Sequence, residues 1–100
     1  MKHDENLLVV AMEESAELQQ ELSKALRFGA ENYHPDEPNI TNAWRIQREF
    51  HQLRAVIDML IIRRIISPMP ESEQSRIYRD KVEQVEKWER YSESIGKVKG

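Results

Sequence analysis

The feature of this sequence that most constrains its fold is an apolar periodicity of three, four and seven residues, the period of an amphipathic helix. It first predicts a helix from about Asp4 to Phe28, with Asp4 as a candidate N-cap and Gly29 as a candidate C-cap. The apolar positions of this stretch are Leu7, Leu8, Ala11, Leu18, Leu22, Ala25 and Leu26. Residues 30–40 carry prolines and asparagines and are predicted to form a loop.

The same period returns after the loop and predicts a second helix that ends near Ile66, with Thr41 and Asn42 as candidate caps. Its apolar positions are Ile46, Phe50, Leu53, Val56, Ile57, Leu60, Ile61 and Ile65. Prolines stop this helix, and a third is predicted from Ser72 to about Ile95 with a thinner apolar stripe. The sequence therefore predicts an all-α fold, an antiparallel bundle of about three main helices.

The bulk composition agrees with this fold class. The chain is 39% hydrophobic and 33% charged and has 3 glycines, which suits surface-rich helices better than a turn-dense β fold. Its 100 residues are predicted to form a single domain, residues 1–100. The exposed-looking Ile61, Ile62 and Ile66 need more cover than one thin helix provides, so we expect self-association to a dimer or tetramer to complete the bundle.

Charge and residue content exclude several classes of function. With 15 basic and 18 acidic residues, the chain has no net basic field, so nucleic acid is not an expected partner. The absence of cysteine excludes thiolate chemistry, and a metal must be held by oxygen or imidazole. No apolar run of the sequence is long enough to span a bilayer, and the start lacks a signal peptide, so we expect a cytoplasmic protein without a membrane partner.

Acidic residues line one shoulder of each of the first two helices. At about 100° per residue, Glu14 and Glu21 flank the stripe centred on Leu18, and Glu17 lies just beyond them. Glu49 takes the equivalent position on the second helix, so antiparallel packing would bring Glu14, Glu17 and Glu49 together. Such carboxylates repel one another unless a cation lies among them, and Mg²⁺, or Mn²⁺, suits oxygen ligands. The alternative is a solvated acidic face.

Two stretches resemble a known family. EESAELQQELSKALRFG (13–29) and TNAWRIQREFHQLRAVIDML (41–60) look like the core helices of the all-α nucleoside triphosphate pyrophosphatases, which include MazG-like proteins and dimeric dUTPases of phage and bacteria. The resemblance spans about half of the chain. It implies Mg²⁺-dependent hydrolysis of a (deoxy)nucleoside triphosphate to the monophosphate and pyrophosphate, in a bacterial or phage-encoded protein.

The family's metal pattern is Glu-Glu-x-x-Glu on one helix and Glu-x-x-Asp on the next. The matching positions here are Glu13, Glu14, Glu17, Glu49 and Gln52. By this resemblance Glu14, Glu17, Glu49 and Gln52 are the expected metal ligands, while Glu13 is a further ligand or orients the attacking water. Gln52 departs from the family aspartate and offers only a neutral carbonyl oxygen, so the site loses one negative charge.

The resemblance also points to residues that contact the substrate. Lys24 lies seven residues after Glu17, on nearly the same helix face, and is expected to assist catalysis by meeting the phosphate; pairing with Glu21 is the alternative. The expected substrate-binding residues are Lys24, Arg27, Asn42 and Trp44. For Asn42 the alternative is a cap or turn, and for Trp44 it is packing.

Three functional hypotheses remain open from the sequence. The first is a nucleoside triphosphate pyrophosphohydrolase whose catalytic residues are Glu13, Glu17 and Lys24. The second is a nucleotide-binding regulatory protein of the same fold, impaired in catalysis by Gln52. The third is a helical interaction module in which the acids only face solvent. Base and sugar preference depend on the loop or on another subunit.

Overall fold

The computed structural model describes residues 1–99, which form three helices: α1 (His3–Phe28), α2 (Asn42–Ile62) and α3 (Glu71–Ser94). The all-α prediction is therefore confirmed. The chain divides into two compact units, Met1–Ser67 with α1 and α2, and a second that begins at Pro68 and holds α3.

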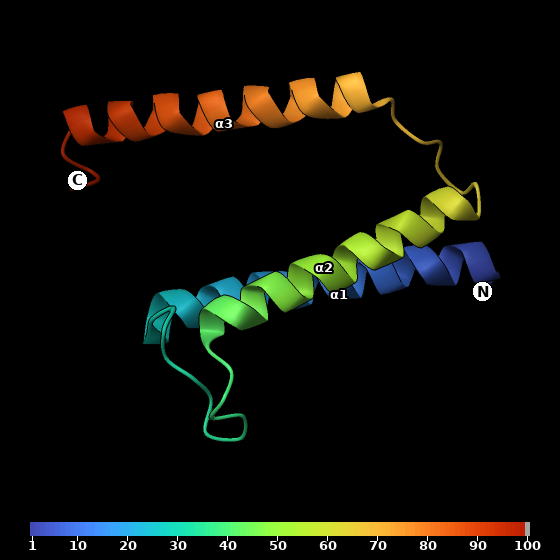
Figure 1. Ribbon diagram of the computed structural model, residues 1–100, viewed down its shortest axis with the longest axis horizontal. Coiled ribbons are helices and arrows are strands. Elements are labelled where there is room, and N and C mark those ends of the chain that lie inside the picture. The colour runs from blue at the N-terminus through green and yellow to red at the C-terminus, as the bar shows by residue number, and fades with distance from the viewer. Residues whose placement is uncertain (100) are drawn as a thin grey trace. The chain divides into compact units, whose positions relative to one another are not determined.

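In the first unit α2 runs back along α1, so the two helices form an antiparallel hairpin (Figure 1). Leu7 near the start of α1 and Leu60 near the end of α2 are its buried apolar side chains, 6% and 2% exposed. Leu18 and Leu53, in the middle of the helices, are only half-buried. One helix covers a narrow strip of its neighbour, and this interface accordingly contains little apolar core.

Backbone and side-chain hydrogen bonds in the loop set the register of the hairpin. The Asn42 side-chain amide donates to the Gly29 carbonyl at 2.9 Å, and the Asn42 backbone N–H donates to the Asn32 carbonyl at 2.8 Å. A third bond joins the Ala43 N–H to the Ala30 carbonyl at 2.8 Å. Asn42 is 4% exposed, so it ties the first turn of α2 to the end of α1 as a buried link.

Most of the predicted helix ends are confirmed. The Thr41 hydroxyl oxygen accepts the Trp44 N–H at 3.1 Å, which makes Thr41 the N-cap of α2. Gly29 ends α1 with a φ of 95°. The bounds of α3 lie within one residue of those predicted.

The predicted start of α1, about Asp4, lies within one residue of the observed start at His3, but the predicted cap is wrong. Its N-cap is Lys2, without a side-chain hydrogen bond, and Asp4 lies inside the first turn. There its negative charge still favours the positive end of the helix dipole.

The end of α2 also differs from the prediction, because the helix stops at Ile62 rather than near Ile66. Arg64 adopts a left-handed φ of 60°. Its N–H donates to the Ile61 carbonyl at 3.0 Å, and the Ile65 N–H donates to the Leu60 carbonyl at 2.9 Å. These two bonds form a Schellman motif, which normally has glycine at the left-handed position. The sequence carries no glycine there, so the apolar period alone predicted a longer helix.

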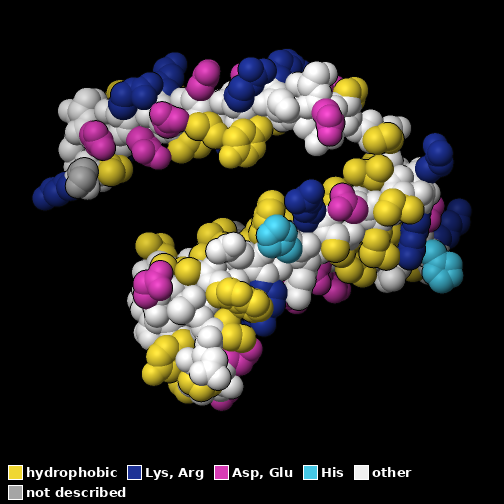
Figure 2. Space-filling model, in the orientation of Figure 1, with side chains coloured by type: hydrophobic (Ala, Val, Ile, Leu, Met, Phe, Trp, Pro, Cys, Tyr) yellow, Lys and Arg dark blue, Asp and Glu magenta, His cyan; other side chains and the backbone are white. Residues whose placement is uncertain are grey.

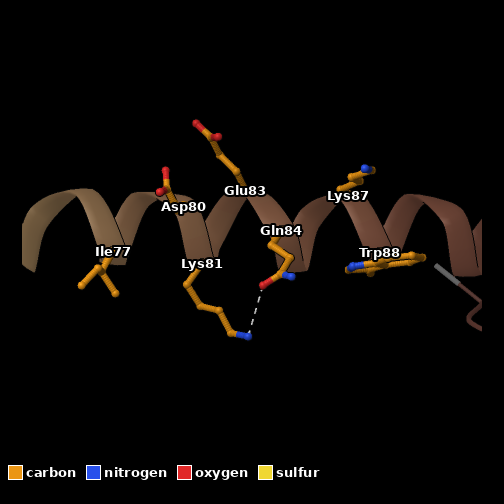
Figure 3. A pocket seen from close by; sticks show the side chains of 7 residues that line it. All are labelled: Ile77, Asp80, Lys81, Glu83, Gln84, Lys87 and Trp88. Carbon is orange, nitrogen blue, oxygen red and sulfur yellow. Dashed lines mark hydrogen bonds between the residues drawn. The ribbon is translucent and has the colours of Figure 1, made fainter.

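The second unit is a single amphipathic helix. None of the residues of α3 is buried, and hydrophobic side chains gather along one of its sides (Figure 2). Figure 3 shows an open depression on this helix, where Ile77 and Trp88 lie on one side and Asp80, Glu83 and Lys87 on the other. No helix of residues 1–99 is long and apolar enough to cross a membrane.

The Schellman motif of α2 predicts a stabilising substitution. Arg64→Gly removes the steric cost of a left-handed non-glycine residue and should raise the free energy of unfolding by about 0.5–1 kcal/mol. Thermal and urea unfolding of the full chain, followed by circular dichroism, measures this change. The matched control is Arg63→Gly at a φ of −81°, which should destabilise the helix end; equal effects of the two substitutions would contradict the argument.

Candidate metal centre and adjoining pocket

Three carboxylates converge where the middles of α1 and α2 meet. Glu14 and Glu17 come from α1 and Glu49 from α2, and each offers an oxygen that lies within 4.8 Å of the others. Glu49 is buried, Glu14 is half-buried and Glu17 is exposed, so the cluster reaches from the helix interface to solvent. The convergence that the sequence predicted for these three acids is thus present in the structure.

The electrostatics of the cluster are unfavourable without a counter-charge. Burial raises the pKa of Glu49, and the neighbouring Glu17 and Glu14 carboxylates raise it further, while Arg48 only partly opposes them. One oxygen of Glu49 and one of Glu14 are buried without any hydrogen-bond partner. A buried carboxylate oxygen without a partner is costly, and a cation bound to oxygen ligands would satisfy it. The donor set, oxygen only and negatively charged, fits Mg²⁺ or Mn²⁺.

The other acids of α1 lie outside this cluster. Glu13 is exposed on α1 and is not among the three converging carboxylates. Glu21 is 7% exposed, and its Oε1 lies 3.5 Å from Lys24 Nζ, so the pairing that the sequence left open is formed. The second oxygen of Glu21 is buried without a partner. The Lys24 side chain remains 44% exposed, so its ammonium is accessible from outside this pair.

Gln52 and Trp44 lie together on the outer side of α2. Both are exposed and line a shallow depression with Arg48 and His51. The Arg48 guanidinium lies 5.2 Å from the centre of the Trp44 ring, a cation–π contact that occupies one face of the indole. Trp44 is therefore not packed in the helix interface, and Gln52 has an exposed amide one turn beyond Glu49.

A pocket of about 520 Å³ lies between the end of α1, the start of α2 and the loop, and none of the three clustered carboxylates lines it. Its lining combines cations, aromatic rings and amides: Lys24, Phe28, Asn32, Tyr33, His34, Pro35, Asn42 and Arg45. Of the predicted substrate-binding residues, Lys24 and Asn42 line it. Arg27 is exposed and lies over the Phe28 ring at 5.1 Å, outside the lining.

Arg45 is a site residue that the sequence prediction missed. It is 8% exposed, its Nη2 lies 2.8 Å from Glu37 Oε1, and its Nε has no hydrogen-bond partner. The available signal was its spacing, because a residue four positions before Glu49 shares the face of α2 that carries that acid. The buried polar residues Glu21, Asn42, Arg45 and Glu49 outnumber the buried leucines, so charge dominates the α1–α2 interface.

The raised pKa of Glu49 sets the sign of a pH dependence. The pKa of Glu49 is higher in the folded chain than its ordinary value of 4.5, so the folded chain binds this proton more tightly than the unfolded chain does. The free energy of unfolding should therefore increase as pH falls through the folded pKa and decrease as pH rises through it. At about pH 7 in chelator, Glu49→Gln should therefore raise Tm and flatten its dependence on pH.

The Glu49→Gln variant also distinguishes electrostatic repulsion among the three carboxylates from metal binding by them. Mg²⁺ should raise the Tm of the unaltered chain and leave that of Glu49→Gln unchanged, since only the former offers the full set of carboxylates. Differential scanning fluorimetry across pH, with and without Mg²⁺, measures both effects. A lower Tm for Glu49→Gln in chelator would show that the carboxylate stabilises the fold instead of destabilising it.

No protein-family model, curated protein or solved structure matches the chain. The resemblance to the all-α nucleoside triphosphate pyrophosphatases therefore stands on the two sequence stretches quoted above. The structure independently brings three acids of those stretches together at one place between two antiparallel helices.

Proposed function

We propose that this protein hydrolyses a (deoxy)nucleoside triphosphate to the monophosphate and pyrophosphate with the help of Mg²⁺ or Mn²⁺. The observation that carries the proposal is the convergence of Glu14, Glu17 and Glu49 from two helices, with buried oxygens that lack partners. A solvated acidic face does not bury its carboxylates, whereas Glu49 is 7% exposed. The resemblance to the pyrophosphatase family supplies the reaction.

The three carboxylates would hold the cation by their oxygens, with Glu49 and Glu14 at the buried end and Glu17 at the solvent end. The bound cation supplies Lewis-acid polarisation of the phosphate and neutralises developing charge. Water attacks the α-phosphorus, the bond from that phosphorus to the α–β bridging oxygen breaks, and pyrophosphate leaves. Glu17 is the exposed member of the cluster and hence the carboxylate that an attacking water reaches.

Lys24 would offset phosphate charge beside this cluster. It is seven residues after Glu17, a rise of about 10 Å along α1, and its exposed ammonium is held by the buried Glu21. The long 3.5 Å separation of that pair leaves donor capacity on the ammonium, because a lysine has three N–H donors. Glu13 lies outside the cluster and would act by orienting water at the exposed edge of the site.

Pyrophosphate release from a panel of (d)NTPs with Mg²⁺ tests the proposal. We expect turnover of at least one nucleotide, and Glu17→Gln should lower kcat by at least about 100-fold because it removes both a ligand and a proton acceptor. Glu86→Gln, the same change at an exposed site on α3, is the matched control and should leave the rate unchanged. Absence of turnover on every nucleotide at high protein concentration would reject the hydrolase.

Gln52 favours a second candidate, a nucleotide-binding regulator that has lost catalysis. Its amide stands where the family has an aspartate, so the metal site carries one negative charge fewer. The same nucleotide panel distinguishes the two, because a regulator shows Mg²⁺-dependent nucleotide binding by calorimetry without product. In that case Gln52→Asp, which restores the carboxylate, should introduce turnover.

We further propose that the bundle is completed by self-association. Apolar side chains that the sequence placed on the stripe of α1 remain exposed, including Leu22 at 51% and Leu26 at 88%, and Ile62 at the end of α2 is 77% exposed. A third candidate function is a helical interaction module. The observation that favours it is that no residue of α3, including those of its apolar face, is buried.

Sedimentation velocity tests the association. We expect a dimer or tetramer at micromolar concentrations, because a monomer of helices with such wide apolar stripes leaves large hydrophobic patches in water. Leu26→Glu, at the most exposed of these leucines, should shift the equilibrium toward the monomer. A monomer at every concentration would contradict the proposal.

A further inference from the structure

We propose that α3 pairs with α3 of a second copy of this chain, as a two-stranded antiparallel coiled coil formed through its exposed apolar face. This surface is different from the apolar stripes of α1 and α2, and the inference does not depend on the proposed hydrolase. A two-fold axis relates the two helices, so the same residues form both sides of the contact and the assembly closes at two copies.

The apolar face of α3 lacks cover within its own unit. No residue of the helix is buried. The hydrophobic side chains at the centre of this face are each about half exposed, namely Ile77, Val85, Trp88 and Tyr91. An amphipathic helix in water gains most of its stability by packing such a face against a partner, and a contiguous exposed apolar face marks an interaction surface.

The spacing of this face is that of a coiled coil. Alternating steps of four and three residues, starting at Ile77, reach Lys81, Gln84, Trp88, Tyr91 and Ile95. These are the a and d positions of a heptad repeat, and they favour another helix as the partner. In Figure 3 the first four of these side chains lie on one side of α3, and Asp80 and Lys87 lie on the other. Acidic residues outnumber basic ones in α3, which disfavours an anionic lipid surface.

The repeat is symmetric about the middle of α3 when the second helix runs in the opposite direction. The helix extends over Glu71–Ser94, so its midpoint lies between Val82 and Glu83. Ile77 and Trp88 are equally far from this midpoint on opposite sides, and each Ile77 therefore meets Trp88 of the second copy. In this register the two helices overlap over all 24 residues. A second copy of α3 thus covers the apolar face of the first from end to end.

The edges of the apolar face are also complementary to themselves in this register. Asp80 and Lys87 lie seven residues apart and hence on the same edge. In the antiparallel pair, each Asp80 carboxylate lies beside the Lys87 ammonium of the other copy, so two oppositely charged pairs flank the interface. On the other edge, Val85 meets Tyr78 of the second copy, which adds apolar contact there. This charge order favours a second α3 over an unrelated helix.

Lys81 and Gln84 determine the relative direction of the two helices. In a parallel pair, each Lys81 would face Lys81 of the second copy, and two ammonium groups would repel within the interface. In the antiparallel pair, Lys81 faces Gln84 of the second copy, whose side-chain carbonyl accepts a hydrogen bond. These two groups are already compatible within one helix, where Lys81 Nζ lies 3.4 Å from Gln84 Oε1. The polar residues at core positions therefore favour the antiparallel pair.

The test is disulfide cross-linking of the full chain, which has no cysteine of its own. Gln74→Cys and Tyr91→Cys are made in separate chains and mixed in a glutathione redox buffer. The antiparallel register brings positions 74 and 91 of two copies together, whereas two copies of either position lie about 25 Å apart along the helix axis. We expect a cross-linked heterodimer from the mixture, identified by mass spectrometry, and no cross-link from either chain alone. Arg90→Cys, on the exposed outer side of α3, replaces Tyr91→Cys as the matched control and should give none.

Charge reversal tests the pairing at the edge of the interface. Lys87→Glu, introduced into both cysteine chains, should lower the equilibrium constant for cross-linking by about tenfold, because it places carboxylates opposite each other at two symmetric sites. Adding Asp80→Lys exchanges the two charges and should restore the cross-link. Glu83→Lys, a charge reversal outside the a and d positions and outside the Asp80–Lys87 pairs, should leave the yield unchanged.

Circular dichroism of each variant establishes that its helices are intact, and Ile77→Cys mixed with Trp88→Cys replaces the first pair if either of those chains fails to fold. Cross-links between two copies of the same position would show a parallel pair and overturn the inference. Absence of any cross-link from the folded chains would show that a different surface covers α3, and would overturn it as well. Failure of Asp80→Lys to restore the cross-link would contradict the charge pairing on which the choice of partner rests.

Discussion

The antiparallel register of α1 and α2 is the constraint on which the rest of this structure depends. Asn42 sets it, since its side chain and backbone bond to Gly29 and Asn32 at the other end of the loop. With the start of α2 held there, the middle of α2 meets the middle of α1, and Glu49 arrives beside Glu14 and Glu17. Asn42, a predicted substrate contact with a cap or turn as the alternative, lines the pocket, and its buried side chain links the two helices.

The interface that this register creates is poor in apolar contacts and rich in charge. Desolvated carboxylates oppose folding unless each gains a partner, and the α1–α2 interface leaves oxygens of Glu14, Glu21 and Glu49 without one. Leu7 and Leu60 are its buried apolar side chains. An interface shaped by stability alone would contain more buried apolar side chains than buried charged ones. A bound cation can relieve the electrostatic cost of such buried carboxylates, which links the packing to the proposed metal-dependent chemistry.

Two kinds of structural feature could be predicted from the sequence, and a third could not. The helices follow from apolar period and from local signals such as Thr41 and Gly29, because capping involves neighbours a few residues away. The shared shoulder of Glu14 and Glu17 follows from helix geometry alone. The end of α2 escaped prediction because a left-handed arginine carries no sequence signal, and Arg64 takes that conformation only as Ile65 turns back toward Leu60.

By itself, then, the sequence determined three helices, their approximate bounds and the pairing of acids along a helix face, since each depends on interactions within a few residues. Only the tertiary structure decided which of those acidic side chains are buried away from solvent. Glu21 and Glu49 are buried and Glu13 is exposed, although all three are glutamates on amphipathic helices. Burial of a charge depends on the helix packed against it, and so does the burial of Arg45. The same packing shapes the pocket between α1, α2 and the loop.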